Sequence, residues 1–127
     1  MPMRAVRSFR DLLVWQRAVE LTVAVYHLTR EFPSDERYGL TSQIRRASVS
    51  VASNIAEGHG RNSTGEFRQF LGMARGSNFE VQTQLILSRK LDLGGNKRLT
   101  LCEGLSDEIE RMLVALSASI DGAARGS

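Results

Sequence analysis

The sequence predicts an all-α protein: an antiparallel, up-down-up-down four-helix bundle that assembles as a homo-oligomer. Strand-like alternation of apolar and polar residues is absent from the sequence. Three clusters of turn-forming residues divide the chain into four segments of helical length, and short connections between long helices make sequential helices antiparallel. With 127 residues, we expect a single domain, 1–127, that is large enough to bury a hydrophobic core.

The turn-forming clusters fix where the helices are expected to begin and end. They lie at residues 32–34, 58–63 and 94–96, and they contain Pro33 and most of the adjacent glycines. Proline and glycine interrupt helices because of their backbone geometry. The predicted helices therefore span about 9–31, 35–57, 64–91 and 97–120, and we expect frayed ends at 1–7 and 121–127.

The first predicted helix is apolar around most of its circumference. Its polar residues, such as Gln16 and Glu20, cluster on one narrow side. Apolar residues cover the remaining arc of about 220°, against little over 100° for an ordinary surface helix. Either this helix is central in the monomer, or part of its surface contacts another subunit.

Two apolar flanks make up this arc, and the pattern does not say which one faces the subunit's own core. One flank contains Val14, Leu21 and Leu28, and the other contains Leu12, Val19 and Tyr26. The candidate residues for an oligomer interface are Val14, Trp15, Leu21 and Leu28.

The second predicted helix combines an apolar seam with a polar row. Ser34 is its candidate N-cap, and Asp35 and Glu36 favour the helix dipole in the first turn. The seam consists of small and branched residues, which allow neighbouring helices to approach closely: Ile44, Ala47, Val51 and Ile55. The polar row beside it is either a buried network or the lining of a channel in an assembly: Gln43, Arg46, Ser50, Asn54 and Glu57.

The third predicted helix opens with a capping-box pattern, in which Ser63 and Glu66 satisfy free amides reciprocally. Its seam then follows alternating spacings of four and three residues: Phe67, Leu71, Ala74, Asn78, Val81, Leu85 and Ser88. The polar Asn78 in such a seam is typical of a residue that fixes register at a cost in stability. The fourth helix is expected to bury Leu101, Leu105, Ile109, Met112, Leu116 and Ile120.

Arginine spacing gives the strongest indication of function. The net charge is +3, and Arg68, Arg75 and Arg89 share one heptad position on the third helix. One interpretation is that this row is part of a strip that contacts phosphates. The candidate nucleic-acid-binding residues are then Arg45, Arg46, Arg61, Arg68 and Arg75. Alternatively, the row pairs with the antiparallel fourth helix, where Glu103 and Glu110 are also seven residues apart. We favour the pairing interpretation, because exposed charges mostly pair or remain solvated.

Patterns for catalysis and metal binding are weak. His27 and His59 lie in different segments, and residues 60–65 have the glycine spacing of a phosphate loop without its Lys-Ser/Thr or its preceding strand. The single Cys102 excludes an internal disulfide and suits a reducing compartment. No stretch approaches the roughly 18 apolar residues of a membrane span. We expect no catalytic residue, metal or cofactor, no membrane insertion and a cytoplasmic location.

Several blocks of the sequence resemble a known family. They are residues 9–16 (FRDLLVWQ), 37–47 (RYGLTSQIRRA) and 53–58 (SNIAEG), and similarity continues to about residue 120. The chain resembles the four-helix-bundle proteins encoded by intervening sequences in bacterial 23S ribosomal RNA genes. The resemblance implies a homopentamer with a central channel and carries no established catalytic residues.

The resemblance also suggests candidate partners. A related group of proteins assists the reverse transcriptases of diversity-generating retroelements, where a basic surface engages nucleic acid and the enzyme. It therefore implies RNA, DNA or a reverse-transcriptase-like enzyme as partner, besides the chain itself. Two hypotheses follow: an oligomeric bundle that binds nucleic acid or a nucleoprotein through the five arginines, or a structural and protein-interaction module whose arginines pair internally.

Overall fold

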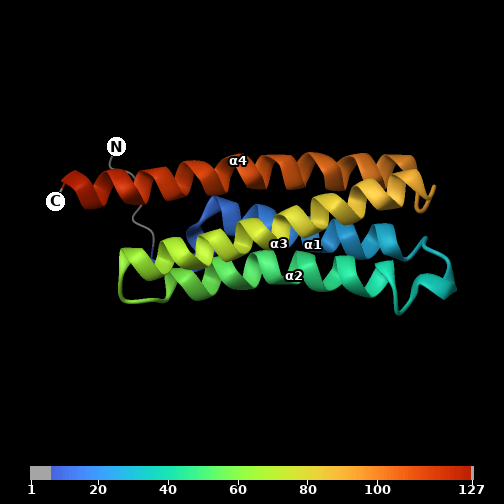
Figure 1. Ribbon diagram of the computed structural model, residues 1–127, viewed down its shortest axis with the longest axis horizontal. Coiled ribbons are helices and arrows are strands. Elements are labelled where there is room, and N and C mark those ends of the chain that lie inside the picture. The colour runs from blue at the N-terminus through green and yellow to red at the C-terminus, as the bar shows by residue number, and fades with distance from the viewer. Residues whose placement is uncertain (1–6, 127) are drawn as a thin grey trace.

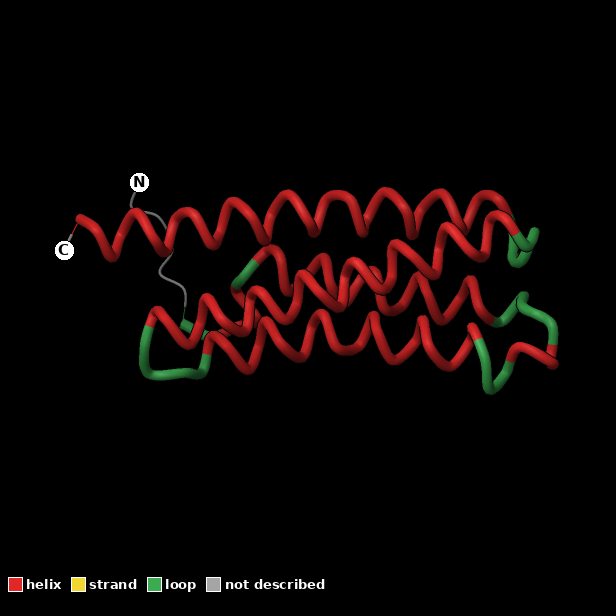
Figure 2. Tube along the Cα trace, viewed as in Figure 1, coloured by secondary structure: helices red, strands yellow, loops and turns green. Residues whose placement is uncertain are grey.

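Four α-helices make up most of the chain. The structure is a computed structural model that describes the backbone of residues 7–126 and the side chains of residues 7–122. In chain order it contains η1 (Phe9–Asp11), α1 (Leu13–Thr29), η2 (Ser34–Glu36), α2 (Leu40–His59), α3 (Thr64–Lys90) and α4 (Asn96–Gly126). The η elements are short 3-10 helices, and none of the described residues forms a strand. The prediction of an all-α fold with four helices is confirmed (Figures 1 and 2).

The helices pack in a ring in which each contacts its neighbours in the chain and α4 returns to contact α1. Among the described residues, α1 and α3 lie at opposite corners, with no Cα atoms within 8 Å of each other. Each helix runs against the preceding one (Figure 1). The ion pairs between α3 and α4 have the order expected of antiparallel helices, because the residue number rises along α3 while it falls along α4. The pairs are Arg68 with Asp121, Arg75 with Glu110 and Arg89 with Glu103.

Helix α1 begins at Leu13, so the predicted start near residue 9 is wrong. A capping box between Ser8 and Asp11 closes a separate short turn, η1. Leu12 then adopts an extended conformation (φ −74°, ψ 121°), which prevents the turn from continuing into the helix. The helix ends at Thr29, two residues before the predicted end.

Helix α2 begins at Leu40, five residues after its predicted start. Ser34 does not cap it, because residues Ser34–Glu36 form the separate turn η2. Gly39 has a non-helical backbone (φ −106°, ψ −114°), and the Leu40 N–H donates to Glu36 Oε1 at 3.1 Å. The helix thus starts after the glycine, and it continues through His59.

The ends of α3 lie within one residue of the prediction, whereas α4 is longer than predicted. The Ser63 hydroxyl accepts the Glu66 N–H at 3.1 Å, so one half of the expected capping box is formed. Helix α4 continues to Gly126, so the predicted fraying is wrong for residues 121–126, and residue 127 lies outside the described residues. Asp121 forms an ion pair with Arg68 of α3. Of the predicted frayed start, residues 1–6 lie outside the described residues.

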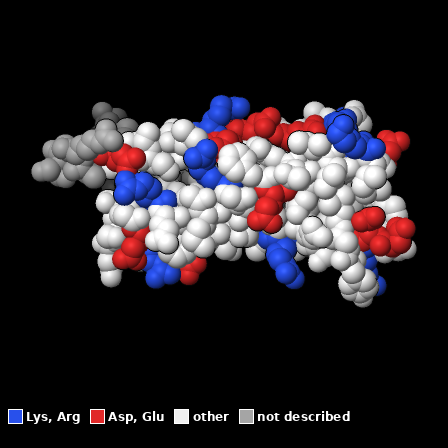
Figure 3. Space-filling view, viewed as in Figure 1, with Lys and Arg blue, Asp and Glu red and all other residues white. Residues whose placement is uncertain are grey.

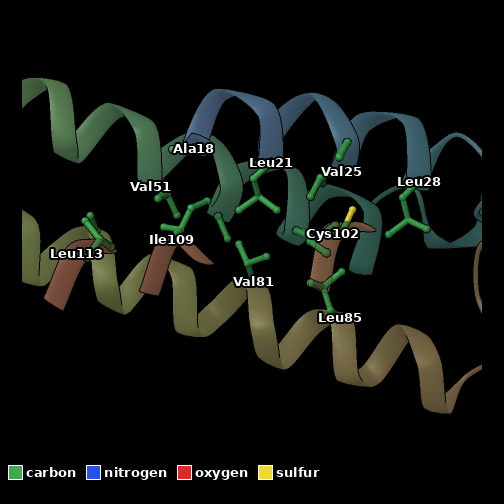
Figure 4. Packing of buried hydrophobic residues seen from close by; sticks show 14 of the residues in the cluster. Ala18, Leu21, Val25, Leu28, Val51, Val81, Leu85, Cys102, Ile109 and Leu113 are labelled. Carbon is green, nitrogen blue, oxygen red and sulfur yellow. The ribbon is translucent and has the colours of Figure 1, made fainter. Parts of the chain in front are cut away.

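All four helices contribute to one hydrophobic core (Figure 4). The predicted seam of α3 is confirmed, with Leu71, Val81 and Leu85 fully or almost fully buried. The prediction for α4 is partly wrong. Leu101 is 56% exposed, and the buried positions include Leu99, Cys102 and Leu113 as well as the predicted Ile109. Apolar residues of α4 lie on its exposed side as well as on its buried side. The spacing of apolar residues alone therefore did not identify the side that faces the core.

The core also contains one buried polar layer between α3 and α4. Asn78 and Ser106 are both fully buried. Asn78 Nδ2 donates to the Ser106 carbonyl at 3.0 Å, and the Ser106 hydroxyl donates to Asn78 Oδ1 at 2.8 Å. Each of the two buried residues therefore donates a hydrogen bond to the other.

Two glycines allow close packing at opposite ends of the bundle. A Cβ on Gly58 would lie 2.6 Å from Phe70 Cβ, so α2 and α3 approach where the chain turns between them. Gly94 has φ +78°, and a Cβ there would lie 2.5 Å from Leu28 Cδ1. Only glycine fits the second position, because it combines a left-handed backbone with a crowded site.

Candidate interaction surfaces

The two flanks of α1 have different environments. Val14, Leu21 and Leu28 are 4%, 0% and 0% exposed. They pack in the core of the single chain, so the prediction that they form an oligomer interface is wrong. Of the four predicted interface residues, only Trp15 reaches the surface. It is half-buried, and its ring meets Phe9 edge-on at 5.1 Å between centroids.

The opposite flank of α1 is exposed. Val19 is 36% exposed, Val23 50% and Tyr26 38%. A shallow groove lies on each side of this exposed flank. The groove between α1 and α2 has a volume of about 300 Å³ and includes Trp15, Val49 and Ala52. The groove between α1 and α4 has a volume of about 400 Å³ and includes Leu101 and Leu105.

Together these residues form a continuous apolar surface, which we call the α1 face. Its members are Trp15, Val19, Val23, Val49, Ala52, Leu101 and Leu105. The titratable side chains lining the two grooves are Glu20 and His27, both beside α4. An apolar surface of this kind, with charge only at its edge beside α4, is typical of a contact site with another macromolecule.

A second apolar surface lies on α3. We call it the α3 face, and its apolar members are the exposed side chains Met73, Phe79, Ile86 and Leu87, with the exposed Glu80 among them. Gly72 and Gly76 lie among them, and a Cβ on either would meet no atom within 4 Å. Figure 3 views this side of the bundle and shows uncharged atoms over much of the surface between scattered charged groups. Because α1 and α3 occupy opposite corners, the two faces point in opposite directions.

The arginine row of α3 pairs with α4. Arg89 binds Glu103 through two hydrogen bonds of 2.8 and 2.9 Å, and Arg75 Nε donates to Glu110 at 2.7 Å. Both pairings were predicted from the heptad spacing and are confirmed. The hydrogen bonds that Arg89 donates to the Glu103 carboxylate raise the pKa of Arg89. Arg68 pairs with Asp121, so the whole row is bound to carboxylates.

Arg61 is paired within its own segment. Its guanidinium lies 3.2 Å from Glu57 and 4.7 Å from the centre of the Phe70 ring. Both partners of the ion pair are largely exposed, and such pairs contribute about 1 kcal/mol or less to stability.

Arg45 and Arg46 differ from the other three candidate arginines. Neither forms an ion pair with a carboxylate among the described residues. Arg45 Nε donates to the Thr29 hydroxyl at 2.8 Å, and its guanidinium lies 4.4 Å from the centre of the Tyr26 ring. Arg46 is exposed.

Arg45 and Arg46 line a surface hollow of about 370 Å³, which we call the arginine hollow. Its lining residues are Tyr26, Arg37, Tyr38, Thr41, Ser42, Arg45 and Arg46. Arg37, Tyr38 and Tyr26 were not among the candidate residues predicted for this role. They come from the end of α1 and from the connection to α2, so no periodic spacing relates them to the arginines of α2.

The polar row of α2 is divided by the structure. Asn54 Nδ2 donates to the Ser50 carbonyl and hydroxyl at 2.9 and 3.0 Å, and Ser50 and Ser77 share a hydrogen bond of 2.9 Å. These residues form a half-buried network between α2 and α3. Gln43, Arg46 and Glu57 are exposed, so the row is not buried as a whole.

The remaining titratable groups form no cluster suited to metal binding. Across residues 7–122, no three His, Cys, Asp or Glu side chains converge as metal ligands. Burial raises the pKa of the Cys102 thiol to about 11. Within the described part of the chain, every helix is too short or too polar to cross a membrane.

Comparisons with known proteins give one family and one fold. The family of 23S rRNA-intervening sequence proteins matches residues 10–115. A crystal structure of a protein with unknown function from the S23 ribosomal protein family of Bacteroides thetaiotaomicron VPI-5482 has a TM-score of 0.75. It shares 22% sequence identity, and the match covers 83% of this chain and 98% of that chain. No curated protein matches the chain.

Proposed function

This chain belongs to the 23S rRNA-intervening sequence protein family, and we propose that it is a non-enzymatic helical bundle that works by self-association. The observation that carries the proposal is the pair of uncovered apolar faces on opposite sides of the bundle. Val23 and Leu101 on the α1 face are each at least half exposed, and so are Met73 and Ile86 on the α3 face.

A second copy of the chain is the partner that fits both faces. If the α1 face of one copy packs on the α3 face of the next, every copy uses two different surfaces. Such head-to-tail contacts close into a ring when the rotation between copies allows it. Gly72 and Gly76 carry no side chain on the α3 surface, so a neighbouring helix can approach the backbone of α3 closely there. The homopentamer that the family resemblance implies is a ring of this kind.

The arginine row supports an interaction module rather than a nucleic-acid strip. Arg68 and Arg75 would have to exchange their carboxylate partners on α4 for phosphates. This exchange would remove contacts that connect two helices of the bundle. RNA, DNA and a reverse-transcriptase-like enzyme stay candidate partners of the assembly, with Arg45 and Arg46 as the candidate arginines that have no carboxylate partner.

The proposal is tested by placing one carboxylate on each flank of α1. In Val19→Glu the new charge lies on the exposed α1 face, so we expect a helical monomer. In Leu21→Glu it lies in the core. An unpaired buried carboxylate costs several kcal/mol, comparable with the roughly 5–15 kcal/mol that stabilises a domain, so we expect this variant to unfold. Light scattering gives the mass, and circular dichroism gives the helical content.

Gln16→Glu is the matched control. It adds the same carboxylate to the polar side of α1, where Gln16 is exposed. Its other effect is to remove one exposed hydrogen bond to the Arg10 carbonyl, so the variant should remain helical and assembled. A wild-type chain that is monomeric at micromolar concentration would refute self-association. An assembled Val19→Glu would show that the α1 face is not the interface.

A further inference from the structure

The arginine hollow gathers cationic groups from separate segments at one end of the bundle. Arg37 belongs to the connection before α2, whereas Arg45 and Arg46 belong to the second turn of the helix. Tyr26 comes from α1 and closes the opposite side. The three guanidinium groups therefore border one concave surface instead of being scattered along a helix.

The charge of the hollow is not compensated by neighbouring carboxylates. Arg17, Arg61, Arg68, Arg75, Arg89 and Arg98 each form an ion pair with an acidic side chain. Among the described residues, no such pair involves the three arginines of the hollow, and no acidic side chain lines it. Glu36 precedes Arg37 in the chain, but its carboxylate accepts the Leu40 N–H at 3.1 Å and does not line the hollow. The hollow is therefore a site of positive potential, which attracts anions.

Arg45 is held in place before any ligand arrives. Its Nε donates to the Thr29 hydroxyl, and its guanidinium carbon lies 4.4 Å from the centre of the Tyr26 ring. These contacts leave the two terminal nitrogens as donors. A guanidinium group binds a phosphate through paired donors in a fixed geometry, so a pre-positioned arginine loses little conformational entropy on binding.

The other lining groups suit a phosphate that carries an aromatic base. Thr41 and Ser42 add hydroxyl donors. Tyr38 is 89% exposed, although it is a large aromatic side chain, and the Arg37 guanidinium lies 5.9 Å from its ring centre. Exposed aromatic rings beside cations are the groups on which single-stranded nucleic acids stack their bases.

We propose that the arginine hollow binds a nucleotide phosphate, either in a free nucleotide or in a single-stranded nucleic acid, with the base stacked on Tyr38. The site uses Arg37, Arg45 and Arg46, and it does not depend on the arginine row of α3. It also does not rest on self-association, since every group of the hollow belongs to one chain.

The test uses anisotropy of a fluorescein-labelled single-stranded RNA oligonucleotide, with AMP, inorganic phosphate and a poly-glutamate peptide as competitors. Arg46→Gln removes an exposed charge from the hollow, and Arg45→Lys keeps the charge but removes the paired donors and the stacking plane. Each should weaken binding by about tenfold. With two or three phosphate contacts, raising salt from about 50 to about 200 mM should weaken wild-type binding by about 7- to 18-fold.

Arg111→Gln is the matched control. Arg111 is also exposed and forms no ion pair with any acidic side chain in residues 7–122, but it lies on α4, outside the hollow. It should change the affinity by less than about twofold. In Tyr38→Leu, binding of RNA and AMP should weaken while binding of inorganic phosphate is unchanged. Circular dichroism and light scattering on each variant separate loss of the site from loss of folding or assembly.

The competitors identify the source of the phosphate. If AMP displaces the labelled RNA, a free nucleotide is sufficient for binding. If only the unlabelled oligonucleotide displaces it, the ligand is a nucleic acid. Three results would overturn the proposal: no binding in low salt, equal losses in Arg46→Gln and Arg111→Gln, or displacement by poly-glutamate as effective as by RNA.

Discussion

The buried pair of Asn78 and Ser106 allows a prediction in which two substitutions together cost less than one alone. In Ser106→Ala the fully buried Asn78 Oδ1 atom loses the hydroxyl that donates to it. A buried polar atom left unsatisfied costs about 1–3 kcal/mol. No large cavity opens, because only a hydroxyl is removed.

The partner substitution has a smaller expected cost. In Asn78→Leu the Ser106 hydroxyl loses its acceptor, but a serine in a helix can donate to the carbonyl four residues earlier. The Ser106 carbonyl loses the hydrogen bond from Asn78, but it lies inside α4, where backbone carbonyls accept helical hydrogen bonds. In the double variant, Asn78→Leu with Ser106→Ala, the layer is entirely apolar. Replacing both partners is nearly neutral or stabilising.

Urea unfolding followed by circular dichroism, at one fixed protein concentration, measures the three free energies. We expect the sum of the single losses to exceed the loss in the double variant by about 1–3 kcal/mol. In a chain of this size 1 kcal/mol corresponds to a Tm change of about 4 °C. A double variant whose loss equals the sum of the single losses would refute the reasoning, because the two groups would then not depend on each other.

Two further predictions concern packing and burial. Gly58→Ala should destabilise the protein by about 1–3 kcal/mol, because its Cβ would meet Phe70 Cβ at 2.6 Å. Gly104→Ala, where a Cβ meets nothing within 4 Å, should stabilise it by up to about 1 kcal/mol. Thermal unfolding of both variants checks the contrast, and equal effects would contradict it. The Cys102 thiol, whose pKa is raised to about 11, should be unreactive towards a disulfide reagent at pH 8 until urea unfolds the chain. Because the folded pKa lies above the unfolded one, this thiol leaves stability unchanged below about pH 9 and lowers it as pH rises towards 11. Rapid labelling of the native protein would show that the thiol is not buried.

Helix number and the α3–α4 pairing could be predicted because each depends on a regular spacing along one segment. The heptad positions of Arg75 and Arg89 match those of Glu110 and Glu103, so the ion pairs follow once the helices are antiparallel. The starts of α1 and α2 could not be predicted in the same way. They are set by Leu12 and Gly39, whose backbone conformations depend on the caps formed by Asp11 and Glu36.

The inner sides of α1 and α4 were ambiguous for a different reason. Both helices carry more apolar residues than the core can cover, so a wheel gives two acceptable orientations. For α1 the structure buries the flank of Leu21 and exposes that of Val19, the reverse of the predicted interface. The arginine hollow was missed because Tyr26, Tyr38 and Arg45 are brought together by the turn between two helices rather than by spacing within one.

The even number of helices has a practical consequence for attaching this protein to a surface. The described chain starts and ends at the same end of the bundle, beside the α2–α3 turn (Figure 2). The α1–α2 connection, which carries Tyr38, lies at the other end. A tether joined at the C-terminal end of α4 would therefore direct the arginine hollow away from the support, towards ligand in solution.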